Sequence, residues 1–149
     1  MITFWPYMAV VDAFQHWAYT HINEAHDPEN CDAKWSELWD RFMIGMDWSD
    51  LQDVKETGWH RKHHIYTHAL YYVEYGLAQL GAAQVWAHSL QDQAGALAAY
   101  RHGLALGGTV TLPDLFTAAG AKFAFDADTL RRAVDLVEST ITQLENASA

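Results

Sequence analysis

The sequence has few of the residues on which nucleic-acid binding, disulfide formation and attachment to acidic membranes depend. Lys and Arg total 9 against 19 Asp and Glu, which gives a formal net charge of −10. A protein of this charge lacks the basic surface that attracts nucleic acids or anionic lipid headgroups. The single cysteine, Cys31, excludes an internal disulfide and a zinc site built from several thiolates. We therefore expect a protein of the reducing cytoplasm that binds neither nucleic acid nor membrane.

Segments that target or divide a chain are also missing. The N-terminus has no basic stretch of the kind that opens a signal peptide, so we expect none. No run of about 18 apolar residues predicts a transmembrane helix. No stretch rich in Pro, Gly or Ser separates two parts, and 50% of the 149 residues are hydrophobic. The sequence thus predicts one folded domain over residues 1–149.

What the sequence does contain is helical periodicity from end to end. Apolar residues recur at spacings of three and four, as they do in amphipathic helices. Asp27-Pro28 and Thr111 are typical of helix starts. Gly45 and Gly107-Gly108 are typical of helix ends. The sequence therefore predicts an all-α fold, a compact domain of about six or seven helices with no sheet.

Three of the predicted helices have particular features. The longest apolar segment runs from about Tyr66 to His88 and is apolar on nearly all sides, which predicts a buried central helix. Ser49 and Gln52 have the spacing of a capping box, so a short helix is expected there. The last helix starts after a cap at Asp126 or Asp128. Its apolar stripe consists of Leu130, Ala133, Val134, Val137, Ile141 and Leu144.

A dense group of histidines and tyrosines lies in residues 59–75. If the segment is helical throughout, four of these rings lie within about 60° of arc on one face of the helix. They are the rings of His64, His68, Tyr71 and Tyr75. Polar rings on an apolar helix must be hydrogen-bonded or face a wet cleft. Their O–H and N–H groups suit the binding of a carbonyl oxygen or an oxyanion. The same pattern also fits a set of hydrogen-bonded core rings.

A self-contained metal site is not predicted. His64 and His68 have the spacing of two ligands on one helical face, but Ile65 follows His64, so no His-Glu-x-x-His motif is formed. No Glu-x-x-His occurs, which argues against a carboxylate-bridged di-iron site. The sequence also lacks a Gly-x-Ser-x-Gly nucleophile motif and a phosphate-binding glycine loop. Cys31 stands beside Asp32 in a predicted surface helix, a poor setting for a nucleophile.

Several blocks of the sequence resemble one protein family. The blocks are residues 12–19, Trp59, residues 64–82, Tyr100 with residues 106–108, residues 112–115, residues 119–120 and Phe123. They resemble the C-terminal part of the oligoendopeptidase F branch of the thimet-oligopeptidase-like zinc metallopeptidases. The block His64-Ile-Tyr-x-x-Ala-Leu-Tyr-Tyr-Val-Glu-Tyr75 is quite specific. The resemblance covers nearly the whole chain.

The resemblance implies a largely α-helical fold around a substrate channel, and hydrolysis of short peptides with the help of zinc. In the family, a His-Glu-x-x-His helix and a later Glu hold the zinc, and the Glu of the motif is the general base. All of these lie upstream of the part matched here. Metal-assisted hydrolysis needs the zinc to activate water. We therefore expect this chain alone to bind no metal and to be inactive.

The resemblance also implies roles for individual residues. His64, Tyr72 and Tyr75 match family residues that bind the substrate backbone and stabilise the oxyanion, and they are the candidate catalytic residues. Tyr71 and His68 are further candidates for substrate binding. The family usually has Pro-Phe where this chain has Ala69-Leu70.

Two functional hypotheses follow. In the first, the chain forms the substrate cleft of an oligoendopeptidase F-like zinc metallopeptidase. Its partners are then short peptides, together with the missing N-terminal part or a second copy of the chain. In the second, it is a non-catalytic helical interaction protein with a groove lined by His and Tyr. Self-association is expected because a segment of a larger lobe leaves apolar surface uncovered.

Overall fold

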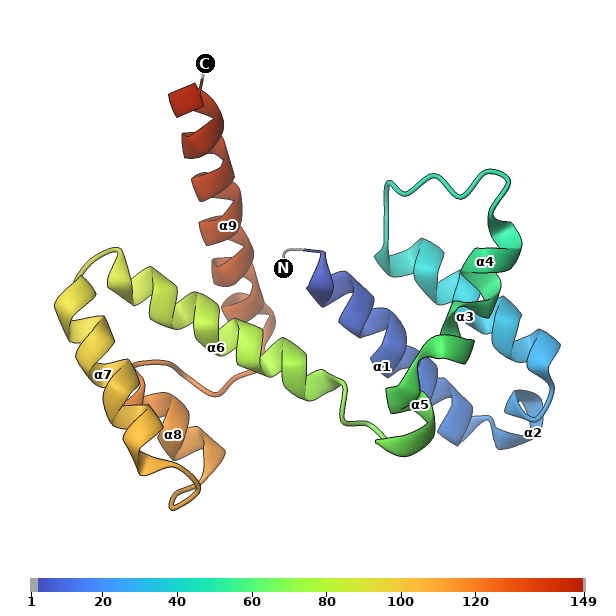
Figure 1. Cartoon of the computed structure of the whole chain (residues 1–149), viewed down its shortest axis with the longest axis horizontal. Coiled ribbons are helices and arrows are strands. Elements are labelled where there is room, and N and C mark those ends of the chain that lie inside the picture. Colours follow the sequence, from blue (N-terminus) through green and yellow to red (C-terminus); the bar gives the residue numbers. More distant parts are fainter. Residues whose placement is uncertain (1–2, 149) are drawn as a thin grey trace. The chain divides into compact units, whose positions relative to one another are not determined.

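The computed structural model describes residues 3–148, which form helices joined by turns and loops and contain no strand (Figure 1). The elements are α1 (Phe4–Thr20), α2 (Ile22–Ala25), α3 (Pro28–Phe42), α4 (Gln52–Glu56), the 3-10 helix η1 (Thr57–Arg61), α5 (His63–Thr67), α6 (Val73–Ser89), α7 (Gln93–Leu106), α8 (Leu112–Ala118) and α9 (Ala127–Ser148). The all-α prediction is confirmed, but six or seven helices is too few for this part of the chain. Four of the helices have only four or five residues, and a single turn is too short to show a period.

Two compact units make up the chain, residues 1–76 and residues 77–149, and each is described by itself. The division falls within α6, so that its first turn belongs to the first unit. Compactness does not show whether either unit folds alone. The single domain expected over residues 1–149 therefore stays a prediction.

The first unit has an aromatic core in which residues of α1 and α3 meet. Val10, Val11 and Phe14 of α1 are at most 2% exposed. Trp35 of α3 is fully buried, and its ring meets that of Phe14 edge to face with 5.3 Å between the centroids. Trp39, one turn later, is also buried. Large rings remove much apolar area from water, so the tryptophans in this unit contribute to its core.

Most of the predicted helix ends are confirmed. The Asp27 side chain accepts a hydrogen bond of 3.0 Å from the Glu29 N–H at the start of α3, with Pro28 as the first helical residue. Thr111 caps α8. Gly107, with a φ of 54°, ends α7 as predicted, whereas the C-cap of α3 is Met43 and Gly45, with a φ of 86°, lies two residues beyond it.

Two predicted features are wrong. The helix expected from about Tyr66 to His88 is interrupted between Thr67 and Val73, where Leu70 adopts a φ of 54°. The residues there include no Gly or Pro, the usual sequence signals of a break. The short helix near Ser49 exists, but Ser49 does not cap it. Its hydroxyl donates instead to the Asp47 carboxylate, 2.6 Å away.

The second unit packs α7 against α8 and joins α6 to the segment before α9. Gly103 of α7 lies so close to α8 that an added Cβ would stand 3.0 Å from the Cβ of Ala119. The amide of Gln84 in α6 exchanges two backbone hydrogen bonds with Lys122, of 3.0 and 2.9 Å. Asp126 caps α9, as predicted, by accepting from the Thr129 N–H at 2.8 Å.

The expectation that the long apolar helix is buried on nearly all sides is also wrong. Leu77 and Leu80 of α6 are buried, but Ala78, Ala82 and Trp86 are exposed. The alanines among them carry too little apolar area to require burial on every side.

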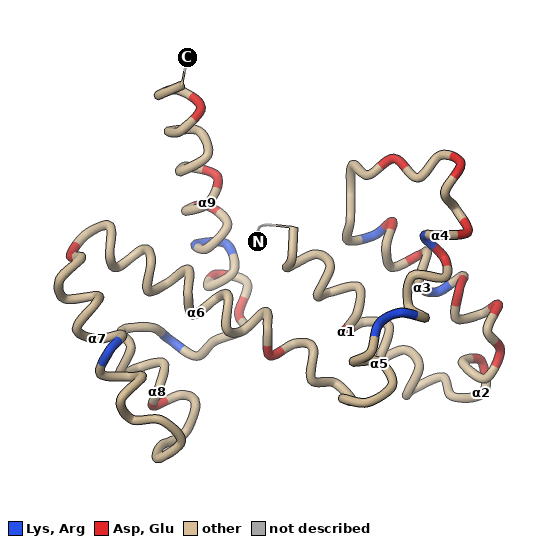
Figure 2. Tube along the Cα trace, in the orientation of Figure 1, with Lys and Arg blue, Asp and Glu red and all other residues tan. Residues whose placement is uncertain are grey.

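Charge is spread unevenly over the elements. Figure 2 shows acidic residues along much of the trace and Lys or Arg in only a few places. α6 has a single charged residue, Glu74.

Among residues 3–148, no helix combines the length and the apolar character that crossing a membrane requires.

Candidate functional site: a cluster of histidine and tyrosine rings

The predicted site residues lie in the first unit, where α5 is joined to α6. We call them the His/Tyr cluster: His64, His68, Tyr71, Tyr72 and Tyr75. α5 ends at Thr67 and α6 begins at Val73, so these residues do not share one helix as the periodicity predicted. The turn around Leu70 brings the second half of the segment back toward α5. The rings are therefore brought together by a bend.

His64 lies at the centre of the cluster. Its Nε2 atom is 3.2 Å from the Tyr75 hydroxyl oxygen. Its ring is edge-on to those of Tyr72 and Tyr75, with centroids 5.1 and 5.6 Å away. The ring of Tyr71 is nearly parallel to it at 6.5 Å, and that of His68 lies 5.7 Å from it. The structure thus brings all five residues of the cluster together.

The cluster has an exposed side and a buried side. Tyr71 and Tyr75 are 44% and 40% exposed, and His64 is half-buried. Tyr72 is only 4% exposed, and its ring packs against those of Phe4 and Tyr7. A ligand at the surface would meet the Tyr75 side chain first, since Tyr72 belongs to the core. Contact between Tyr72 and a substrate stays a prediction.

Lys62, which sequence analysis did not single out, completes the buried side. Its ammonium group donates a hydrogen bond of 2.7 Å to the Tyr72 hydroxyl and lies 4.8 Å from the ring centroid of Tyr7. Burial, and then the charge of Arg61, lowers the pKa of Lys62. The only sequence signal for Lys62 was the basic pair Arg61-Lys62, which stands just before the His/Tyr cluster in a chain that has few basic residues.

Tyr72 is held in its neutral, protonated form. Burial raises its pKa to about 12, and the neighbouring phenols of Tyr7 and Tyr75 add to the effect. The cost of placing a negative charge in a poorly hydrated site explains the direction. The ring therefore serves as a neutral, fixed surface against which His64 packs.

His64 is also held toward its neutral form. Partial burial lowers its pKa, and the charge of Lys62 and of two neighbouring histidines, His68 and His63, lowers it further. The backbone carbonyl of His64 accepts a hydrogen bond of 3.4 Å from the amide of Gln15, a buried residue of α1. A neutral imidazole has one N–H donor and one acceptor nitrogen. When Nε2 is the donor, it bonds to the Tyr75 oxygen and leaves the Tyr75 hydroxyl proton for a ligand.

This arrangement suits the binding of a neutral acceptor such as a peptide carbonyl. The exposed hydroxyls of Tyr71 and Tyr75 are donors, and the rings around them offer apolar contact to a chain laid across them. Within residues 3–148, no group of three or more His, Cys, Asp or Glu is placed to hold a metal ion.

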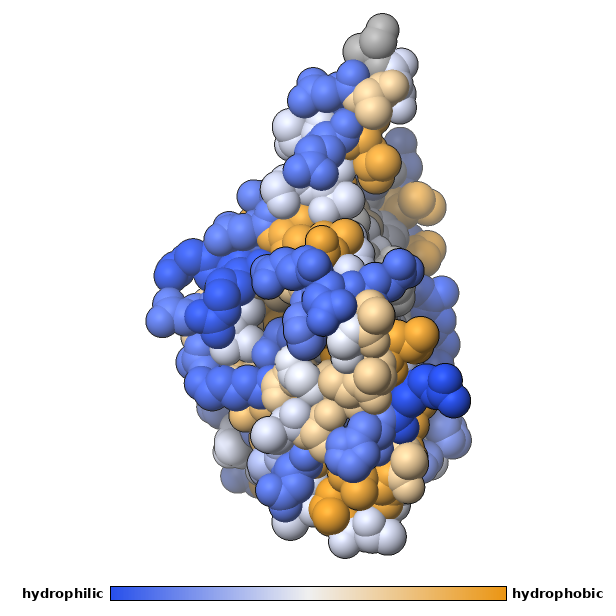
Figure 3. Space-filling model, turned by 90° about the vertical axis from the view of Figure 1, so that its left-hand side faces the viewer, coloured by the Kyte–Doolittle hydropathy of each residue, from blue (hydrophilic) through white to orange (hydrophobic). Residues whose placement is uncertain are grey.

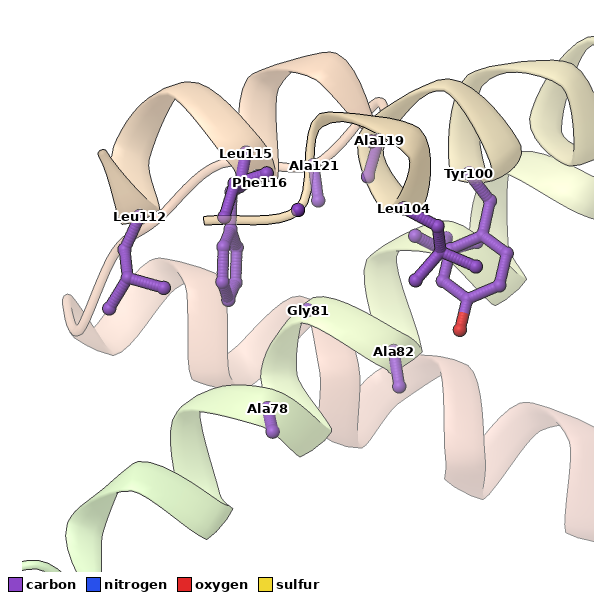
Figure 4. Close-up of a pocket in the computed structure, with 13 residues that line it drawn as sticks. Ala78, Gly81, Ala82, Tyr100, Leu104, Leu112, Leu115, Phe116, Ala119 and Ala121 are labelled. Carbon is purple, nitrogen blue, oxygen red and sulfur yellow. The ribbon is translucent and has the colours of Figure 1, made fainter. Parts of the chain in front are cut away.

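A second feature of the surface lies in the second unit. An apolar cavity of about 350 Å³ is bounded by α6, α7 and α8 (Figure 4). Small residues of α6, Ala78, Gly81 and Ala82, form one wall, and Phe116 of α8 stands beside them. The Tyr100 hydroxyl is the single side-chain polar group among the lining residues. Nothing in the sequence marked this cavity, because its lining comes from three helices and has no common motif.

Comparison of the chain with protein-family models, with curated proteins and with solved structures finds no match.

Proposed function

We propose that the exposed side of the His/Tyr cluster binds the backbone of short peptides. In this proposal the cluster forms one wall of the substrate cleft of an oligoendopeptidase F-like zinc metallopeptidase. The zinc ligands and the general base are supplied from outside this chain. The observation that carries the proposal is the His64–Tyr75 pair, whose atoms lie 3.2 Å apart at the surface with Tyr75 40% exposed.

Two observations on the pair and the segment that carries it support peptide binding. The lowered pKa of His64 keeps the ring uncharged near neutral pH, so that an uncharged backbone is a suitable ligand. On the buried side of the cluster, the Gln15 amide donates a hydrogen bond to the His64 backbone carbonyl, and Lys62 donates one to the Tyr72 hydroxyl. These two hydrogen bonds hold the segment in place. Donors that are fixed before the ligand arrives stabilise a developing oxyanion better than mobile ones do.

The turn between α5 and α6 lies where the chain departs from the pattern of the resembling family. It contains Ala69-Leu70, the position at which the family usually has Pro-Phe. A proline in a helix interior kinks or breaks the helix, so a break at this position is compatible with the family pattern. Here the break occurs without proline, and it places Tyr75 against His64.

A binding experiment tests the cluster directly. An end-blocked, uncharged octapeptide is titrated into the chain, and the shifts of assigned NMR signals are followed. We expect saturable shifts at His64, Tyr71 and Tyr75, and weaker binding by Tyr75→Phe. The matched control is Tyr100→Phe, since Tyr100 is a tyrosine of similar exposure, 45%, in the second unit. Equal loss of binding in both variants, or no loss in Tyr75→Phe, would contradict the proposal.

A second experiment tests the peptidase part of the proposal. The chain alone, with zinc added, is expected to leave a quenched fluorescent oligopeptide uncleaved. Cleavage is expected when the chain is joined to a segment that carries His-Glu-x-x-His, because zinc then activates water at the cleft. In that assembly, Tyr75→Phe should lower kcat by about 100-fold or more if the hydroxyl stabilises the oxyanion. Chelator-sensitive cleavage by the chain alone would contradict the proposal that the zinc ligands and the general base come from outside this chain.

The alternative function, a non-catalytic helical interaction protein, is favoured by a different observation. The cavity of the second unit is apolar and is bordered by exposed side chains, Leu104 and Leu112 among them. Apolar grooves of this kind receive amphipathic segments of partner proteins. In the octapeptide titration, shifts confined to Tyr100 and the cavity would favour this alternative over the peptidase.

A further inference from the structure

The last helix has an apolar stripe that the structure leaves largely uncovered. Leu130, Ile141 and Leu144 of α9 are 43%, 39% and 63% exposed, and Val134 and Val137 between them are half-buried. At the top of Figure 3, along α9, orange hydrophobic residues lie beside blue hydrophilic ones. Exposed apolar surface that continues along a helix indicates an interaction site.

The exposed part of the stripe, which leaves out the buried Ala133, is distinct from the buried face of α9. Thr129 and Ala133 are the buried residues of this helix. At 100° per residue their mean direction lies roughly 80° around the helix from that of the stripe. Among the described residues, one face of α9 is buried and the neighbouring face is largely exposed.

The spacing within the stripe says what kind of surface it fits. From Leu130 the apolar residues follow at intervals of four, three, four and three, which is the heptad pattern of a coiled coil. The stripe extends for about 21 Å from Leu130 to Leu144. A heptad face is complementary to another heptad face, and the one in α9 is largely exposed.

An antiparallel pair of α9 helices from two copies pairs four residues of the stripe with one another and places Leu144 opposite Ala127. Leu130 then lies opposite Ile141 of the second copy, and Val134 lies opposite Val137 of the second copy. The residues that flank this seam are also complementary, since Arg131 of each copy comes within reach of Glu138 of the other. In a parallel pair these two residues lie too far apart along the axis to meet. Opposite charges beside a seam determine orientation and partner choice.

We propose that α9 is a self-association surface, and that a second copy of this chain covers it as an antiparallel helix pair. The pair is isologous, so that each copy presents the same stripe and a dimer closes the contact. An interface of this length falls in the small class, below about 1,200 Å². The dimer is therefore weak and forms in the micromolar range.

Sedimentation velocity at concentrations from low micromolar to several hundred micromolar tests the proposal. We expect the wild-type chain to shift from monomer to dimer. Leu144→Glu should weaken the dimer by about tenfold or more, because an apolar anchor is replaced by a charge at the seam. The matched control is Leu104→Glu in α7, since Leu104 is also 63% exposed but borders the apolar cavity. It should dimerise as the wild type does.

The outcomes separate the possible interfaces. A wild-type chain that stays monomeric over the whole range overturns the proposal. So does a dimer that withstands Leu144→Glu, or one that Leu104→Glu disrupts. Far-UV circular dichroism of each variant shows whether the helices are retained. Both leucines are mostly exposed, so the helical signal is expected to be unchanged.

A charge exchange tests the antiparallel orientation. Arg131→Glu or Glu138→Arg alone should weaken the dimer, roughly two- to fivefold, because each change places like charges opposite each other. The double variant R131E/E138R should restore wild-type dimerisation. Within one chain Arg131 pairs with Asp128 at 3.1 Å, so Asp128→Asn serves as the control for loss of that contact. Failure of the double variant to restore the dimer overturns the antiparallel pairing.

Discussion

Trp35 shows how much the first unit depends on a single side chain. It is fully buried, and its ring contacts those of Phe14 and Trp39 within the core. Interiors are packed as densely as organic crystals, so removal of an indole leaves a cavity that neighbours fill only in part. The chain has seven tryptophans, but only the structure shows which of their rings lie inside.

Replacement of Trp35 should therefore destabilise the protein strongly. We expect Trp35→Ala to lower the free energy of unfolding by about 3–5 kcal/mol. Urea denaturation followed by far-UV circular dichroism measures the change. Trp86→Ala is the matched control, since Trp86 is 36% exposed, and its loss should be much smaller. Equal losses in the two variants would show that Trp35 is not a core anchor.

Sequence analysis correctly predicted that His64 lies beside Tyr75, but it did not predict the turn that brings the two residues together. Helical periodicity predicted that His64 and Tyr75 share a face, and the two side chains do meet. They meet through a turn in which Leu70 has a positive φ, a conformation that no local sequence signal announces. Lys62 was missed because its role depends on rings from α1 and from residue 72, which only the fold brings together.

The electrostatics of His64 give a prediction with a definite sign. Burial and then the charge of Lys62 lower its pKa, so the NMR titration midpoint of His64 should lie below 6.5. Lys62→Met removes a positive neighbour and should raise that midpoint. Lys34→Met is the control, because Lys34 pairs with Glu37 and is not among the causes of the shift. A midpoint that does not rise in Lys62→Met would rule out this electrostatic contribution.

The same shift determines the direction of a pH effect on stability. Because the folded state resists protonation of His64, the unfolded state binds more protons below about pH 6.5. The contribution of His64 is therefore fully present above that pH. It is lost as pH falls through the unfolded value toward the lower folded one.

At the scale of helices, sequence analysis succeeded where a short-range interaction determines the boundary. Asp27, Thr111 and Asp126 cap their helices as the spacing predicts, because a cap involves only residues within one turn. It failed at Ser49, whose hydroxyl is bonded to Asp47 in the structure. It also failed for α6, since competing tertiary contacts decide where a long apolar segment breaks.

The cap of α3 can be tested by substitution. Asp27→Ala removes the acceptor of the Glu29 N–H, and we expect a loss of about 1 kcal/mol in the free energy of unfolding. The substitution should lower the stability of the whole first unit, because α3 contributes Trp35 and Trp39 to the aromatic core. Asp27→Asn retains an acceptor and should be close to the wild type. Chemical denaturation of both variants gives the comparison, and a similar loss in each would argue against the capping hydrogen bond.

At the scale of the whole molecule, the division into two units is the feature that sequence analysis did not anticipate. No linker composition marks it, because the boundary falls inside a continuous helix. The buried residues of the aromatic core all lie between Val10 and Tyr72, and the apolar cavity is lined only by residues of the second unit. The candidate peptide site and the dimer surface therefore belong to different units.

A self-contained core predicts that the first unit folds without the second. The piece comprising residues 1–76 retains every member of the aromatic core, including Tyr72, which packs against Phe4 and Tyr7. We expect it to unfold cooperatively on heating, although a unit of this size has only a narrow margin of stability. Residues 1–66, which lack Tyr72, should show a weaker transition at a lower temperature. A gradual loss of the far-UV signal in the 1–76 piece would instead favour one domain over residues 1–149, because the first unit would then need the rest of the chain in order to fold.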